Sequence, residues 1–299
     1  MTHKFLVMIA ALFFVGFNSP CARAQEKHLE AGETAFSIDS DNIVIQVRFA
    51  GKGPYRMVLR TGTPSSYVDA SFLSIVKESG GTLVPLSPMP VDVKVVKTKL
   101  LAELKDVEVG SFRIKRLMAV LEDYSGMNAS QHLLSAPVHG VLGFNLLNDR
   151  VLQIDYPRSV IRFLASSPYK KDDVRQGDAR RFTIALRMSP LDGVPVIDEV
   201  YVGGKKVKTV MDTGFTGTLA LTPRGIKSLG LPATGAQPAV FVMKVGEAPE
   251  ISLTPELVPE GAYTYKRFEA YDAVIGHAFL SNYVLTFDLK RKLVTLERP

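Results

Sequence analysis

Cysteine is almost absent from this chain, since Cys21 is the only one among 299 residues. It lies in an N-terminal segment with the pattern of a cleaved export signal. Lys4 supplies a positive charge, residues 5–17 form a short apolar stretch, and residues 22–24 are a small-x-small cleavage site. Cleavage after residue 24 would leave a mature chain without cysteine. That excludes disulfides, a thiolate nucleophile and a metal held by cysteine.

Long apolar runs are absent as well. The thirteen residues 5–17 are too few to cross a bilayer, which takes about 20 residues in a helix. No later segment is apolar enough to span a membrane. We therefore predict a signal peptide at residues 1–24 and an exported mature protein, either periplasmic or secreted. An uncleaved N-terminal anchor or an amphipathic start is the alternative interpretation of the same segment.

A large excess of either charge is also lacking. The chain has 36 basic and 30 acidic residues, and removal of Lys4 and Arg23 with the signal would leave a net charge of +4. Basic residues are spread along the chain, and the two densest clusters, at residues 113–116 and 170–171, are not interleaved with aromatic residues. This pattern indicates solvated surface and argues against nucleic acid as a partner.

Motifs for cofactors and metals are missing too. The sequence has no His-x-x-x-His or carboxylate–histidine spacing that would suggest a metal site. It has no glycine-rich phosphate-binding loop, and no serine lies in the surroundings of a nucleophile elbow. We therefore expect neither a metal nor a cofactor.

What the chain does contain is an internal repeat. Each half has an alternating apolar strand, a glycine-containing turn, a second strand, and a loop that ends in Thr-Gly. The equivalent segments are residues 43–49 and 195–202, 51–54 and 203–206, 55–59 and 207–211, and 60–62 and 212–214. The pattern predicts a strand, a hairpin turn, a strand and a glycine loop in both halves.

The repeat continues further along each half. An apolar-apolar-Gly segment ends at Gly143 in the first half and at Gly276 in the second, and two strand patterns follow in each case. Gly143 and Gly276 are 133 residues apart, and so are Asp155 and Asp288 in the strands that follow. An identical offset at two separate places indicates duplication of one ancestral unit.

The repeat predicts an all-β protein of two homologous lobes with a few short helices. We place the first lobe at residues 25–165 and the second at residues 181–299. Residues 166–180 are predicted to be the linker, because they are polar and charged without an apolar period. Residues 223–229 should form a helix that starts at proline and stops at Gly230. Residues 65–79 should hold a helix, or a strand followed by a helix.

These residues resemble the pepsin and retropepsin clan of aspartic peptidases. The resemblance rests on the apolar-apolar-Asp-Thr-Gly loop at Asp212-Thr213-Gly214, its counterpart Arg60-Thr61-Gly62, the two apolar-apolar-Gly segments and the closing strand pairs. It covers nearly the whole mature chain. It implies that the two loops meet at the base of an interlobe cleft, where the Thr61 and Thr213 hydroxyls hydrogen-bond across the lobes.

The clan's chemistry needs two facing carboxylates that share a proton and activate a water. Here only Asp212 can act as one of them, since Arg60 stands where the other belongs and is always protonated. The resemblance also implies that the Thr216 hydroxyl supports the carboxylate, whereas the first loop has Pro64 at that place. The expected flap of the first lobe, between residues 81 and 110, contains neither glycine nor tyrosine.

The sequence thus predicts one candidate catalytic group, Asp212, with Thr213, Gly214 and Thr216 around it. Arg60 is expected to form an ion pair with Asp212 or, alternatively, to reach solvent. The favoured function is an exported peptidase homologue, impaired as a monomer, that binds a peptide or protein in its cleft.

The alternative is an active aspartic endopeptidase that combines Asp212 with a second carboxylate. That carboxylate would come from a homodimer or from another position, and Asp69, Asp155 and Asp288 are the residues to consider. Asp69 lies nine residues past Arg60, in the element that leaves the loop, and Asp155 and Asp288 are better explained by turn or surface roles. None of the three is expected to face Asp212. The protein is accordingly expected to be a monomer or a homodimer.

Overall fold

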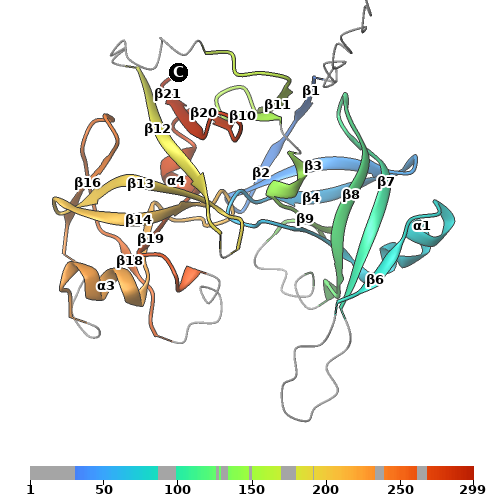
Figure 1. The fold of residues 1–299 in the computed structure, drawn as a ribbon, viewed down its shortest axis with the longest axis horizontal. Helices are drawn as coiled ribbons and strands as arrows, with labels where there is room; N and C mark the ends of the chain where they lie inside the picture. Colours follow the sequence, from blue (N-terminus) through green and yellow to red (C-terminus); the bar gives the residue numbers. More distant parts are fainter. Residues whose placement is uncertain are drawn as a thin grey trace, which may run out of the picture.

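Two large β-sheets make up most of the protein (Figure 1). The structure is a computed structural model that describes residues 31–86, 99–125, 128, 134–147, 150–169, 180–190, 192–232, 239–260 and 268–299. The predicted signal peptide and most of the predicted linker lie outside these residues. Among the helices in these ranges, none is long and apolar enough to cross a membrane.

The first sheet has eight strands and belongs to the first half of the chain. Its order is β2-β3-β4-β9-β5-β8-β7-β6, and β3 also pairs with β7, which curls the sheet toward a barrel. The strands are β2 (Ser37–Asp39), β3 (Asn42–Phe49), β4 (Lys52–Leu59), β5 (Ser66–Asp69), β6 (Leu83–Pro85), β7 (Leu100–Val109), β8 (Phe112–Glu122) and β9 (Gly140–Leu142). In β3 the side chains of Ile43, Ile45, Val47 and Phe49 are buried, so this face of the sheet lines the core of the lobe.

The second sheet has thirteen strands and spans both halves, in the order β1-β11-β10-β20-β21-β12-β13-β14-β19-β15-β18, with β16 joined to β13 and β17 to β16. Strands from the first half are β1 (Gly32–Ala35), β10 (Val151–Asp155) and β11 (Val160–Leu164). Those from the second half are β12 (Arg181–Met188), β13 (Pro195–Val202), β14 (Lys205–Met211), β15 (Leu219–Leu221), β16 (Phe241–Val245), β17 (Ile251–Leu253), β18 (Glu256–Leu257), β19 (Ala273–Ile275), β20 (Val284–Asp288) and β21 (Leu293–Glu297).

The two halves are joined by the antiparallel pairing of β10 with β20. Val151 pairs with Asp288 and Asp155 pairs with Val284, so the register is symmetric about its middle pair, Gln153 and Thr286. The Gln153 side-chain amide donates to the Thr286 hydroxyl at 3.1 Å, and these residues are 133 apart. The duplicated strands therefore meet around a local twofold axis. Figure 1 shows β10 and β20 side by side between the two lobes.

Each lobe repeats the same crossing of strands beneath its loop. In the first lobe β4 runs parallel to β9, and in the second β14 runs parallel to β19. A short helix follows each of these inner strands, η2 (Phe144–Leu146) in the first lobe and α4 (His277–Leu280) in the second. The apolar-apolar-Gly segments thus lie directly beside the strands that end at Arg60 and Asp212, as the repeat predicts.

The other helices agree with the predictions made from local sequence. Helix α3 (Pro223–Leu229) is capped by the Thr222 hydroxyl, which accepts from the Gly225 amide, and it stops at Gly230, whose φ of 74° is left-handed. The segment 65–79 holds β5, then η1 (Ala70–Phe72) and α1 (Leu73–Glu78). A strand followed by helix is therefore the correct alternative for that segment.

The predicted flap region of the first lobe is described in part. Strands β6 and β7 pair antiparallel, with Leu83 opposite Ala102. The segment that connects them, residues 87–98, lies outside the described residues. Its lack of glycine and tyrosine remains an observation on the sequence alone.

Candidate functional site

The two loops predicted to face each other have equivalent backbone hydrogen bonds. The Arg60 amide donates to the Leu142 carbonyl at 3.0 Å, and the Asp212 amide donates to the Ile275 carbonyl at 2.9 Å. Each loop is therefore anchored on the apolar-apolar-Gly segment of its own lobe. The two loops share this backbone arrangement although one begins with a guanidinium and the other with a carboxylate, because it depends on main-chain groups alone.

Threonine side chains connect the loops across the lobes. The Thr61 hydroxyl donates to the Met211 carbonyl at 2.9 Å and accepts from the Thr213 amide at 3.1 Å. The Thr213 hydroxyl donates to the Leu59 carbonyl at 2.9 Å and accepts from the Thr61 amide at 3.1 Å. Both threonines are buried. The predicted exchange of hydrogen bonds is confirmed, and it fixes the two loops against each other.

Asp212 lies at this junction without solvent access, since its relative exposure is 0%. Its Oδ1 accepts from the backbone amides of Gly214 at 2.8 Å and Gly62 at 3.2 Å. A Cβ at Gly62 would lie 2.4 Å from Cγ of Asp212, so only glycine fits there. The first loop thus covers the carboxylate closely, which keeps water and any ligand away from it.

Arg60 makes the equivalent contact with the glycine of the second loop, Gly214. A Cβ at Gly214 would lie 2.5 Å from both Cδ and Nε of Arg60, so the side chain runs closely over the second loop. Arg60 also lines the cleft pocket described below. Each loop thus packs its first side chain against the glycine of the other loop, with a cation in the first loop and an acid in the second. The ion pair between Arg60 and Asp212 stays a prediction.

Thr216 lies elsewhere than the resemblance implies, since its side chain is exposed. The Phe215 amide donates to the Asp212 carbonyl at 3.1 Å in a tight turn, and the Phe215 side chain is buried. Phe215 fills the space above Gly276, where a Cβ would lie 2.4 Å from its ring. Because this aromatic ring takes the inner position, Thr216 turns outward and makes no side-chain hydrogen bond to Asp212 among the described residues.

Pro64, the counterpart of Thr216, is compatible with the first loop for a similar reason. Its carbonyl accepts from the Asn145 amide at 3.0 Å, as the Thr216 carbonyl accepts from Ala278 at 3.3 Å. Because this position contributes its carbonyl and not its amide, proline fits without loss of a hydrogen bond.

A pocket of about 430 Å³ lies beside Arg60, with walls from both lobes. Its lining residues are Arg60, Gly62, Thr63, Pro64, Tyr67, Lys99, Glu122, Tyr124, Val141, Asp192 and Val194. Burial and the nearby Glu122 charge raise the pKa of Tyr124, although the Arg60 cation opposes them. Tyr124 is therefore a neutral hydroxyl at the pH values where proteins work. Its volume falls in the range of pockets that bind small ligands.

Asp192 is the site residue that the sequence analysis missed. It lies between β12 and β13, and its half-buried side chain enters the pocket from the second lobe. The sequence signal was weak, since an Asp-Gly pair before a strand is ordinarily read as a turn. The contact that holds Asp192 comes from Tyr271, far along the chain.

The other candidate carboxylates have structural partners instead of a dyad role. Asp69 accepts from the Ser71 and Tyr124 amides, which hold its pKa below the ordinary value against the opposing effect of burial. Asp155 and Asp288 end β10 and β20, and each accepts the amide three residues on, from Arg158 and Arg291. They are equivalent turn residues of the duplicated strands, as their spacing suggests.

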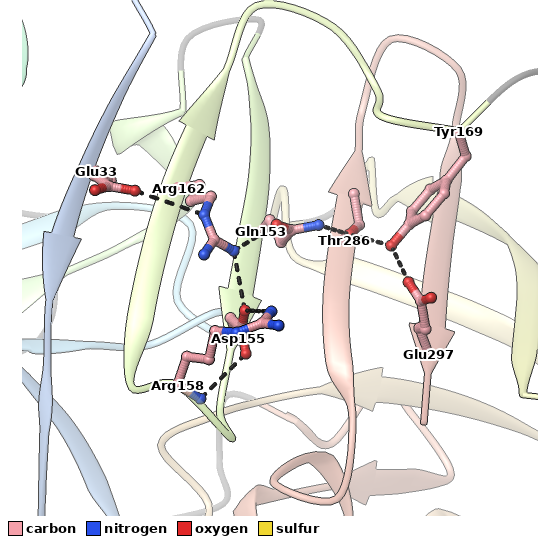
Figure 2. Close-up of polar contacts among 8 residues, drawn as sticks. All are labelled: Glu33, Gln153, Asp155, Arg158, Arg162, Tyr169, Thr286 and Glu297. Carbon is pink, nitrogen blue, oxygen red and sulfur yellow. Dashed lines mark hydrogen bonds and ion pairs between the residues drawn. The ribbon is translucent and has the colours of Figure 1, made fainter. Parts of the chain in front are cut away.

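Asp155 also belongs to a polar network on the sheet that joins the lobes (Figure 2). Arg158 and Arg162 each donate to its Oδ2 at 3.0 Å, and Arg162 also donates to Gln153 at 2.9 Å. Burial by itself would raise the pKa of Asp155, but the hydrogen bonds from the two arginines outweigh it and lower the pKa. Figure 2 shows the network continuing through Thr286 to Tyr169.

The depressed pKa of Asp155 predicts a pH-dependent contribution to stability. A carboxylate with a lowered folded-state pKa stabilises the protein above its unfolded pKa of about 3.9 and loses that contribution as the pH falls through the folded value. We expect Asp155→Asn to reduce the free energy of unfolding by about 2 kcal/mol at pH 7. The difference from wild type should shrink below about pH 4. Urea unfolding at pH 7 and pH 3 measures it, and an equal difference at both values would contradict the assignment.

Metal ligation gains no support from the described residues, which contain no group of three or more histidine, cysteine or acidic side chains placed to hold an ion. The sequence likewise lacks a motif for one.

Comparison with known proteins supports the architecture. The crystal structure of basic 7S globulin from soybean matches with a TM-score of 0.52, over 90% of this chain and 94% of that chain, at 12% sequence identity. This chain has a pepsin-like fold. At that identity the likeness establishes the fold alone. No protein-family model and no curated protein matches the chain.

Proposed function

We propose that this protein is an exported pepsin-like protein that does not cleave peptide bonds and binds a peptide or protein segment in its interlobe cleft. It is a member of the pepsin and retropepsin clan with a degenerate first motif. The observation that supports the proposal is the composition of the two facing loops. Arg60 stands where the clan has one carboxylate, and the other carboxylate, Asp212, is 0% exposed beneath Gly62.

Peptide hydrolysis on this fold requires a water molecule held between two carboxylates. Such a water needs access to Asp212, which is 0% exposed and lies beneath Gly62. A second carboxylate from a homodimer would also require the second lobe to leave its own first lobe. The pairing of β10 with β20 and the threonine exchange oppose that separation.

Binding without cleavage is the function that this arrangement supports. The pocket beside Arg60 combines aromatic walls from Tyr67 and Tyr124 with charged groups from both lobes. Export of the mature chain is part of the same proposal and rests on the pattern of residues 1–24.

The first test is hydrolysis of an unfolded protein substrate by the mature chain between pH 3 and pH 7. We expect no turnover from wild type or from Asp212→Asn. Arg60→Asp alone should also be inactive, because Asp212 would still lie beneath Gly62. Turnover by wild type that disappears in Asp212→Asn would overturn the proposal and favour the active endopeptidase.

The second test is direct binding. Peptides selected from a random library displayed on phage should slow amide hydrogen exchange at residues 60–64 and 192–194, which line the pocket. The β13–β14 turn at residues 203–206 serves as an internal control and should exchange at an unchanged rate. Failure to select any peptide, or protection confined to other regions, would contradict binding in the cleft.

A further inference from the structure

The cleft pocket holds a carboxylate for which peptide cleavage on this fold has no use. Oδ1 of Asp192 accepts a hydrogen bond from the Tyr271 hydroxyl at 2.5 Å, and the Val194 amide lies 3.5 Å from the same oxygen. Oδ2 has no hydrogen bond or ion pair to any residue that the structure describes. One oxygen of Asp192 is thus fixed by the protein while the other remains available to a ligand.

Tyr271 makes this carboxylate a rigid feature of the pocket. Its side chain is 0% exposed, its hydroxyl lies 2.7 Å from Oγ of Ser189, and the Lys208 ammonium lies 4.7 Å from its ring centre. Burial and the hydrogen bond to Asp192 raise the pKa of Tyr271 to about 12. The phenol therefore stays protonated and continues to hold Asp192 over the whole working pH range.

The other acids near the pocket are not available in the same way. Glu122 forms an ion pair with Lys99 at 2.7 Å, so these two charges offset each other. Asp212 has no exposed surface through which a ligand could reach it. Asp192 is therefore the carboxylate that the pocket offers to a ligand.

We propose that Asp192 is the specificity-determining residue of the cleft and that it selects peptides with a basic side chain. This inference rests on the proposed function and names the class of ligand. A lysine or arginine side chain would donate a charge-assisted hydrogen bond to Oδ2 of Asp192. Arg60 lines the same pocket and would interact with carbonyl or carboxylate oxygens of that ligand. Its positive charge would disfavour a second basic side chain on the peptide.

Three pools of fluorescein-labelled octapeptides test the proposal, random in sequence except for a fixed central lysine, glutamine or glutamate. Fluorescence anisotropy at low salt should show that the lysine pool binds about tenfold more tightly than the glutamine pool. The glutamate pool should bind most weakly. Asp192→Asn should abolish the preference, because it keeps an oxygen for Tyr271 but removes the charge. Asp192→Lys should favour the glutamate pool.

Asp198→Asn is the matched control, since Asp198 belongs to the same hairpin but pairs with Arg187. It should leave the lysine preference unchanged. If no pool binds, the proposed function and this inference both fail. If the pools bind equally, or if Asp192→Asn retains the lysine preference while still folded by circular dichroism, only this inference fails.

Discussion

Replacing Thr213 with valine is expected to lower the free energy of unfolding by about 3 kcal/mol. Valine has nearly the same shape but no hydroxyl, so the Leu59 carbonyl and the Thr61 amide both lose a partner. These groups are buried at the junction of the lobes, where water cannot replace the lost bonds. Urea unfolding followed by circular dichroism measures the change, since the chain has no tryptophan to report fluorescence.

A control separates the junction from the general effect of removing a hydroxyl. Thr209 is also 0% exposed, but its hydroxyl donates only to the Val207 carbonyl within the same strand. Thr209→Val should cost about 1 kcal/mol. The double variant Thr61→Val with Thr213→Val should cost less than the two single changes together, because both act on one interface. A Thr213→Val cost no larger than that of Thr209→Val would contradict the role assigned to the exchange.

Alanine at Gly276 should destabilise the protein by about 3 kcal/mol or more. Its φ of −123° is open to any residue, so the effect is one of space alone. A Cβ there would lie 2.3 Å from the Phe215 carbonyl oxygen, which also accepts from the His277 amide. The loop that carries Asp212 would have to move. Gly143→Ala should cost a similar amount, because a Cβ there would lie 2.3 Å from the Ser65 carbonyl oxygen.

The same substitution at Gly204 provides the comparison. This turn glycine has a φ of 76°, and no atom lies within 4 Å of the place that a Cβ would take, so Gly204→Ala tests backbone strain without a clash. It should cost about 1 kcal/mol. Thermal unfolding of the three variants ranks them. An equal loss of stability in Gly204→Ala and Gly276→Ala would show that the close approach of the Asp212 loop is not the reason for glycine at position 276.

Much of the fold could be predicted from residues near each other in the sequence. The alternation in residues 43–49 and 195–202 predicted strands that the structure contains, because side chains on a half-buried strand must alternate. The equal offsets around Gly143 and Gly276 predicted a second copy of the same unit. The pairing of the loops through Thr61 and Thr213 followed from the resemblance and is present in the structure.

The prediction for Thr216 was wrong because it depended on how one loop turns in space. Phe215 has a large apolar surface, and burial of that surface against Gly276 decides which side chain faces inward. The number of residues between Asp212 and Thr216 could not show whether Phe215 or Thr216 faces inward. Asp192 was missed for a related reason. Its place in the site depends on the hydrogen bond from Tyr271, far along the chain, and on the pocket that it lines.

The sequence by itself determined that the chain is a duplication with one acidic and one basic loop, Asp212 against Arg60. Those facts are local, since they need only the order of residues in each half. The tertiary structure alone decided that Asp212 has no access to solvent and that Asp192 enters the cleft. Both depend on contacts between distant segments. The glycines of one loop admit the side chain of the other, and the buried Tyr271 holds a carboxylate from the segment between β12 and β13.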